Sequence, residues 1–467
     1  MAIGMVILSG FIGWATLEVR TARHTEYREQ ALQIAEAGID YYRWHLAHAP
    51  TDYQDGIGVA GPYEHDYYDK SGNKLGTFTL DIVAPTVGST LVTVHSTGRV
   101  LTDSTVERTL QVKLGKPSFA KFALVTNDDV WEDNVEVFGP YHANGGVHFS
   151  NVLAHNIVTS ARTTYVDPDF YGTEWGVYTD KPTTTYPTGD PLPPTPFSDR
   201  SDVFLAGRVI GVPAVDFTGM MADLATLKAS AQLGGGYYAP SGGFGYHIVL
   251  KTTGKYDIYK VTSQIPSPNG SCTANYVYAD PGGGMWSVQT EDPVLSDVPF
   301  PANGVIFTED DVWVDGTIDH ARLTIAAARF PDNPSTRANI IVNNDVRYTN
   351  YDGSDSIGLI AQNDFRIGYD SLDTLHIDGA IIAQSGAIWR DVYYNCGPSD
   401  IRTKIETNGS LITNQRYTFS WVCGFGFCSG YRAQTSTFDS NMLYGPPPSF
   451  PLTSDKYQVL SWDEIIN

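Results

Sequence analysis

The sequence is poor in charge, and in positive charge above all. Charged residues make up 18% of the 467 positions, with 30 Lys and Arg against 52 Asp and Glu, which gives a formal net charge of −22. So few charges exclude a long soluble helical protein. The negative excess repels the phosphates of nucleic acids. We therefore expect no nucleic-acid partner and interpret the acidity as surface solvation.

Motifs for catalysis and metal binding are also missing. The chain has no G-x-S-x-G, H-E-x-x-H or G-x-x-x-x-G-K-[ST] segment, and none of its four cysteines has C-x-x-C spacing. We interpret His142, His148 and His155 as polar strand positions rather than as a metal site. Residues 352–355 (DGSD) are interpreted as a plain turn rather than as a calcium loop. We therefore expect no catalytic residue, no cofactor and no metal.

One apolar run stands out, at the N-terminus. Residues 1–17 carry no charge, residues 18–46 follow without a proline, and Pro50 ends the segment. In the second part, apolar residues recur at helical spacing as one stripe, namely Leu32, Ala35, Ile39, Tyr42 and Leu46. The pattern predicts one long helix whose first part is apolar all round and packs in lipid or among like helices. The side chains expected to make these contacts are Ile3, Val6, Ile7, Phe11, Ile12, Trp14 and Leu17.

Residues 35–38 (AEAG), downstream of this apolar run, resemble the N-terminus of PilX-type minor pilins and related type IV pilin-like proteins. The resemblance implies a subunit that the inner membrane holds before assembly and that joins a filament through its N-terminal helix. Met5 stands where the family usually has glutamate, and no leader-peptidase site precedes the run. Residues upstream of Met1 that are missing or already removed would explain both departures. A single-span anchor and a signal peptide are the alternatives.

The next part of the chain, residues 51–116, predicts a small antiparallel sheet. Residues 51–73 are loop-like, and three strand patterns follow at residues 77–83, 91–95 and 105–114, with turn signals between them. A meander packed on the helix is the expected product. Residues 96–98 (STG) before a closing strand resemble the small sheet of a pilin head.

Residues 117–467 change character and predict a β-solenoid, similar to a right-handed β-helix. Motifs of the type Asn/Asp-Asp-apolar recur beside short β-branched runs at irregular intervals, and the Asp residues are expected at corners. Residues of about 160–300 interrupt the pattern as an inserted or capping region, with a predicted helix at 216–233 and two strands within 246–261. A β-sandwich is the competing interpretation.

Residues 303–390 and 443–463 resemble an uncharacterised C-terminal β-domain that often accompanies PilX-like N-termini. The resemblance implies a fold and a setting but no chemistry. Three consecutive prolines, at 446–448, are stiff and extended. We expect this C-terminal stretch to run back along the solenoid surface as a strap.

The cysteines are expected to form two disulfides, because an even count in an exported chain favours pairing. Cys423 and Cys428 bracket four residues of which two are glycine, so this loop can turn back on itself. We predict a bond between them. By elimination, Cys272 pairs with Cys396.

Taken together, these patterns predict a mostly β protein with a long N-terminal helix, built as a structural subunit of a type IV pilus or pseudopilus-like filament. Residues 1–50 form the stalk helix, 51–116 the small sheet and 117–467 the β-rich head. The expected partners are other pilin subunits, with a surface glycan as a ligand for adhesion, and the expected location is an extracellular filament. A membrane-anchored β-helix enzyme acting on carbohydrates is the alternative.

Overall fold

The structure is a computed structural model that describes residues 2–86, 89–170, 172–217, 220–267, 272–274, 284–423, 426–443 and 445–465. The chain forms two compact units. The helix–sheet unit comprises Met1–Thr86, Thr90–Pro117 and Thr453–Asn467, and the strand-stack unit comprises Val87–Ser89 and Ser118–Leu452. The strand-stack unit is therefore an insertion within the helix–sheet unit, which holds both ends of the chain.

The N-terminal helix is continuous, as the sequence predicted. α1 (Ala2–His48) ends just before Pro50. Its C-terminal part packs on a sheet through side chains that are fully or almost fully buried and share one stripe, namely Ala31, Ile34, Ala35, Ile39, Tyr42 and Leu46. Among the described side chains of α1, those of residues 10–26 are exposed.

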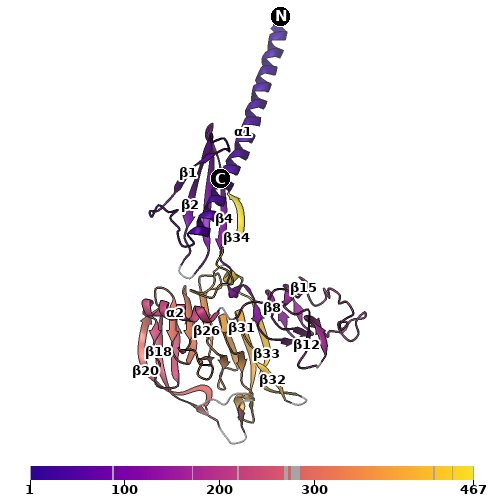
Figure 1. The fold of residues 1–467 in the computed structure, drawn as a ribbon, viewed down its shortest axis with the longest axis vertical. Coiled ribbons are helices and arrows are strands. Elements are labelled where there is room, and N and C mark those ends of the chain that lie inside the picture. The colour runs from indigo at the N-terminus through magenta and orange to yellow at the C-terminus, as the bar shows by residue number, and fades with distance from the viewer. Residues whose placement is uncertain are drawn as a thin grey trace. The chain divides into compact units, whose positions relative to one another are not determined.

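The sheet beneath α1 has five antiparallel strands in the order β1-β2-β3-β4-β34 (Figure 1). Its strands are β1 (Tyr63–Tyr68), β2 (Lys74–Val83), β3 (Val92–Val100), β4 (Asp103–Gly115) and β34 (Gln458–Ile465). β2, β3 and β4 agree with the predicted meander.

The two outer strands correct the sequence-based prediction. β1 falls in the segment expected to be a loop, because a polar edge strand (YEHDYY) lacks the apolar alternation of an inner strand. β34 falls in the expected surface strap, and instead it pairs with β4 and joins Glu464 to Arg108 in an ion pair. Residues 453–467 thus belong to the helix–sheet unit and not to the predicted β-domain of residues 117–467.

Glycine allows the helix to lie very close to the sheet. A Cβ atom on Gly98 in β3 would lie 2.1 Å from the carbonyl oxygen of Ala31 and 2.5 Å from the backbone nitrogen of Ala35. On the helix side, a Cβ on Gly38 would lie 2.3 Å from Ser96 Oγ. Residues 35–38 and 96–98, which carry the family resemblance, therefore form the contact between helix and sheet.

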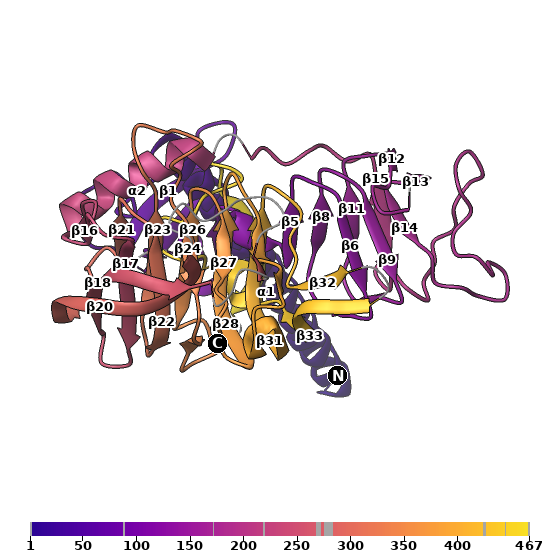
Figure 2. The same ribbon diagram turned by 90° about the horizontal axis from the view of Figure 1, so that it is seen from below.

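The strand-stack unit is built on short strands that pair in parallel. One series follows the order β16 (Tyr237–Tyr238), β21 (Val305–Thr308), β23 (Arg322–Ala327), β26 (Ser356–Ala361), β28 (Thr374–Ala383), β31 (Ile401–Thr413), β5 (Leu124–Thr126), β8 (Tyr141–Ala143), β11 (Val158–Ser160) and β15 (Arg208–Ile210). Figure 2 shows these strands as a row. Their parallel pairing does not fit a β-sandwich, which is made of antiparallel sheets.

Further parallel series flank the first. One consists of β17 (Gly245–Lys251), β22 (Val312–Ile318), β24 (Ile340–Val342), β27 (Phe365–Ile367) and β29 (Ile388–Arg390). Another consists of β6 (Val130–Asp133), β9 (Val147–Ser150) and β14 (Val177–Thr179). A third runs through β22, β25 (Val346–Tyr348), β28, β31, β33 (Gly426–Thr437), β7 (Glu136–Val137) and β10 (Leu153–Ala154). The side chains between the series form one apolar core.

The remaining strands pair in antiparallel fashion. β17 continues into β18 (Lys255–Pro266) and β20 (Gly284–Pro299), and short pairs join β12 (Thr164–Val166) to β13 (Thr173–Trp175), β19 (Thr273–Ala274) to β30 (Tyr393–Tyr394), and β32 (Ser420–Cys423) to β33. α2 (Met220–Gly234) lies against β16 and β21, close to the helix predicted at 216–233. Residues 218 and 219, within that prediction, lie outside the described residues.

Stack order and chain order differ in this unit. The strands of residues 124–210 stack on β31 and β33, so the chain enters the row at its middle, runs to one end, crosses to the other end and returns. In Figure 2 the purple strands β5, β8 and β11 therefore continue the row of orange strands. We call the contact of β5 and β7 with β31 and β33 the seam.

The Asp corners agree with the prediction only in part. Asp128 and Asp310 each accept a hydrogen bond from the backbone N–H of the next residue, as expected for a corner that bonds its own turn, whereas Asp129 and Asp311 bond the backbone of a later segment. Asp129 Oδ1 accepts a hydrogen bond from the backbone N–H of Gly146 at 2.6 Å, and Asp311 Oδ1 accepts one from Asn339 at 2.7 Å. Asp352 accepts from the backbone of Ser354 at 2.9 Å, as in a plain turn. The proline stretch lies on the stack, where Thr324 Oγ1 donates to the carbonyl of Pro448 at 2.5 Å.

Candidate functional site

The first part of α1 exposes the apolar side chains that the sequence assigned to assembly. Phe11 is 65% exposed, Ile12 57%, Trp14 62% and Leu17 64%. Ile3, Val6 and Ile7 belong to the same helix, but their side chains lie outside the described residues. Large apolar residues gathered on a surface mark an interaction site. Among the residues that the structure describes, no helix is long and apolar enough to cross a membrane.

All four cysteines are paired. Cys272 is joined to Cys396 with a Cα–Cα distance of 4.4 Å, and Cys423 is joined to Cys428 with a Cα–Cα distance of 5.6 Å. This is the pairing expected from the sequence. The first bond links two segments 124 residues apart, and the second closes a loop within five residues.

A groove of about 890 Å³ runs along the strand-stack unit, in the size range of ligand pockets. Two tryptophans, Trp286 and Trp389, line it, and the guanidinium of Arg366 lies between them, 4.6 Å and 5.1 Å from the ring centroids. The other charged residues of the lining are Asp311, Arg329, Arg337 and Asp364. Aromatic rings and hydrogen-bonding groups therefore meet in one hollow.

The charged side chains of this groove form ion pairs and hydrogen bonds with other residues of the fold. Arg366 donates to both carboxylate oxygens of Asp391 at 2.9 Å and to Asp364 at 2.5 Å. Burial raises the pKa of Asp391, and the Arg366 guanidinium opposes this rise. Asp364 also accepts from the backbone of Ala387, and Asp311 is paired with Arg329. The carboxylates of Asp311, Asp364 and Asp391 are therefore all engaged by other groups of the fold.

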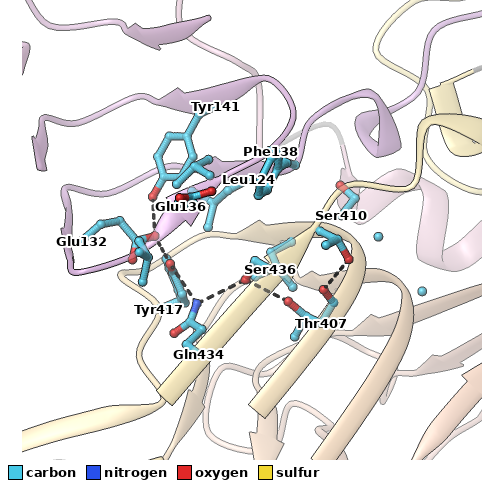
Figure 3. A pocket seen from close by; sticks show the side chains of 17 residues that line it. Leu124, Glu132, Glu136, Phe138, Tyr141, Thr407, Ser410, Tyr417, Gln434 and Ser436 are labelled. Atoms are coloured by element: carbon cyan, nitrogen blue, oxygen red, sulfur yellow. Dashed lines mark hydrogen bonds between the residues drawn. The ribbon is translucent and has the colours of Figure 1, made fainter. Parts of the chain in front are cut away.

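A second, much smaller cavity of about 30 Å³ lies at the seam (Figure 3). It has room for about one or two water molecules and none for an organic ligand. Beside it, the buried carboxylate of Glu132 accepts hydrogen bonds from the hydroxyls of Tyr141, at 3.0 Å, and Tyr417. Burial raises the pKa of Glu132 to about 7, although both tyrosine hydrogen bonds act to lower it. The seam therefore contains a carboxyl group that can change its charge near neutral pH.

The three histidines singled out in the sequence have different partners. His142 bonds to Thr159 and Asn144, and His155 faces Glu136 at the surface. His148 instead lies buried beside two carboxylates, which come from residues of the hairpin β12–β13. Burial lowers the pKa of His148, but these carboxylates outweigh burial and raise it. No sequence spacing marks this cluster, because its members meet only through strand pairing.

Comparisons with known proteins do not show a family for this chain. No protein-family model matches the chain, and no curated protein matches it. Among solved structures, the competence-associated pilin ComZ from Thermus thermophilus is similar, with a TM-score of 0.34 and 13% identity over 94% of this chain and 98% of that one. A superposition of this quality does not establish a common fold.

Proposed function

We propose that this protein is a subunit of a type IV pilus-like or pseudopilus-like filament, assembled through the first part of α1. The observation that carries the proposal is the contrast along one helix. Phe11, Ile12, Trp14 and Leu17 are exposed, whereas the stripe from Ala31 to Leu46 is buried on the sheet. An apolar half-helix in water is unfavourable, by about 25 cal/mol per Å² of apolar surface, so it should be covered. Equivalent helices of other subunits are the occupants that the sequence resemblance suggests.

The proposal includes a precursor stage in the inner membrane and a head outside the cell. Before assembly, lipid would cover the apolar part of α1. After assembly, the parallel strand series of residues 118–452, which we interpret as a β-solenoid, would be displayed on the filament surface. The net charge of −22 and the two disulfides suit such an exported location.

A charge in the stalk tests this assignment. Phe11→Asp should abolish incorporation of the full-length protein into filaments, because a carboxylate in a lipid or helix core costs a few kcal/mol. Val59→Asp is the matched control, since Val59 is also an exposed apolar residue but lies in a loop. Filaments sheared from cells are assayed for both variants. Normal incorporation of Phe11→Asp would refute the stalk assignment.

The groove favours a second role, adhesion to a glycan. Trp389 supplies a half-buried aromatic ring and Arg337 a half-buried guanidinium on the same lining. The same grouping of carboxylates, basic residues and aromatics would suit the alternative of a carbohydrate-active enzyme. The structural engagement of Asp311 and Asp364 supports binding without cleavage.

Binding and cleavage are separated by one set of assays. The full-length protein in detergent is applied to a glycan array, and any glycan that it retains is incubated with it and analysed for released oligosaccharides. We expect retention that Trp389→Ala reduces and no release. The matched control is Trp44→Ala, an exposed tryptophan on α1. Reproducible release would favour the enzyme, and equal retention by Trp389→Ala would exclude this groove.

A further inference from the structure

Three acidic and basic side chains converge in the part of the stack formed by β9 and the hairpin β12–β13. His148 belongs to β9, Glu174 to β13, and Asp167 follows β12 directly. His148 Nδ1 lies 3.1 Å from Asp167 Oδ2 and 3.0 Å from Glu174 Oε2. The three side chains are only 2%, 2% and 5% exposed. Two carboxylates and one imidazole are thus withdrawn from water together.

A proton on His148 Nδ1 would have to be shared between two acceptors. An Nδ1–H group can be directed fully at one acceptor, but here two carboxylate oxygens face the same nitrogen. The other ring nitrogen, Nε2, is buried and has no hydrogen-bond partner. The distance from Nε2 to the carboxylate oxygen Asp180 Oδ2 is 3.6 Å.

A second histidine of the same unit shows what an imidazolium site looks like. His247 Nδ1 lies 2.8 Å from Glu291, and its Nε2 lies 3.2 Å from Asp315. Each ring nitrogen therefore has its own carboxylate, as two N–H donors require. His148 departs from this pattern, because its carboxylates converge on one nitrogen and leave the other without a hydrogen bond.

Charge and spacing both fit a metal ion between the three ligand atoms. Even with a doubly protonated imidazole, two buried carboxylates leave a net charge of −1, which is costly in the interior. A divalent ion on a neutral imidazole brings the sum to zero. Tetrahedral zinc bonds of about 2.0–2.2 Å place ligand atoms about 3.3–3.6 Å from each other. The distances from Nδ1 to the two carboxylate oxygens, 3.1 and 3.0 Å, are somewhat shorter, so the ligand atoms would separate slightly around a bound ion.

We propose that His148 Nδ1, Asp167 Oδ2 and Glu174 Oε2 bind one divalent transition-metal ion, with zinc as the first candidate. A nitrogen ligand favours zinc over calcium or magnesium, which prefer oxygen alone. The hydroxyl of Tyr165 donates to the same two carboxylate oxygens at 3.1 and 3.0 Å and closes the cluster from another side. Asp180 Oδ2, 3.6 Å from Nε2, is the carboxylate oxygen that would accept from Nε2–H after a small approach, the role that carboxylates usually have behind a metal-bound histidine. The ion would fasten the hairpin β12–β13 to β9.

Metal content and affinity test the site in the full-length protein. Protein purified in detergent is treated with a chelator and titrated with Zn²⁺ by calorimetry, and the metal content before treatment is measured by mass spectrometry. We expect one ion per chain and a rise in the unfolding temperature with zinc. Glu174→Gln keeps the side-chain shape and should weaken binding at least tenfold. Asp180→Asn should weaken zinc binding by about 10–100-fold, as expected for a residue that holds the other ring nitrogen of a metal-bound histidine.

The matched control is Glu136→Gln, which changes the exposed pair of His155 and Glu136 (3.4 Å) and should leave zinc binding unchanged. Substitution of Co²⁺ in the unmutated chain gives a readout that does not depend on folding of a variant, because a nitrogen–oxygen site produces visible absorption bands. Binding of no ion by the unmutated chain, or equal binding by Glu174→Gln, would overturn the proposal. The cluster would then be an imidazolium held by two carboxylates.

Discussion

Asn127 Nδ2 donates a hydrogen bond to Asn414 Oδ1 at 2.8 Å, although 287 residues separate the two side chains. The backbones next to them are partners in the same parallel ladder, with Leu124 opposite Leu411 and Thr126 opposite Thr413. Within the strand-stack unit, the strands of residues 124–210 thus meet the strands β31 and β33 at the seam. Contacts across this seam determine whether the unit behaves as one body.

The buried carboxyl group at the seam predicts a pH-dependent stability. The pKa of Glu132 rises from 4.5 to about 7 on folding, so the folded state binds the proton more tightly than the unfolded state. Stability from this group is therefore greatest below about pH 4.5, declines as the pH rises towards 7, and is constant above it. The total change is at most about 3 kcal/mol. Tyr141, Tyr417 and Arg416 are the polar and charged groups that act on this carboxyl group.

The variant Glu132→Gln isolates this effect, because an amide keeps the side-chain shape and cannot ionise. We expect the decline in unfolding free energy between pH 4.5 and 7 to become smaller by about 3 kcal/mol at most. Glu136→Gln is the control on the neighbouring strand, since that side chain is 59% exposed. Denaturant unfolding at several pH values measures both. An unchanged pH profile in Glu132→Gln would contradict the assignment.

The close contact of α1 with β3 predicts a strong effect of one methyl group. Gly98→Ala places a Cβ atom 2.1 Å from a backbone oxygen of the helix, so helix and sheet must separate. We expect a loss of at least about 1–3 kcal/mol in the helix–sheet unit. Gly13→Ala, on the exposed part of α1 with no atom within 4 Å, should be neutral or stabilise the helix by up to about 1 kcal/mol. Hydrogen exchange of the buried stripe of α1 measures the difference, and equal protection in the two variants would exclude the close contact.

The two disulfides should contribute unequally to stability. Replacing Cys272 and Cys396 by serine opens a loop of 124 residues, and replacing Cys423 and Cys428 opens one of five. The loop-entropy relation gives about 5 kcal/mol for the long loop and about 2 kcal/mol for the short one. Chemical unfolding of the two double variants provides the comparison. A larger loss for the short loop would show that loop entropy does not govern either bond.

Much of the fold could be predicted because its signals are local. The apolar stripe of α1 and the alternation of β2 to β4 each depend on neighbouring residues in the chain. The polar edge strand β1 carries no such signal and was missed for this reason. The pairing of β34 with β4 also depends on the whole insertion that lies between them.

The candidate sites were predictable to different degrees for the same physical reason. The assembly residues of α1 were predicted from one uncharged run, and the structure leaves Phe11, Ile12, Trp14 and Leu17 exposed, while their role in assembly stays a prediction. The cluster of His148, Asp167 and Glu174 was missed, because its ligands converge only when a hairpin folds against β9. The groove was missed as well, since Trp286 and Trp389 lie about a hundred positions apart and meet through the stack.

The most direct test of the assembly claim is crosslinking through the stalk in cells that produce the filament. All four native cysteines are in disulfides, so a cysteine introduced at Trp14 is the only free thiol of the chain. We predict that Trp14→Cys gives oxidised multimers with other stalk-cysteine subunits in sheared filaments, whereas Val59→Cys does not. The contradicting result is a filament that contains the protein without a crosslink through position 14. Multimers that form through position 59 instead would then exclude assembly by α1.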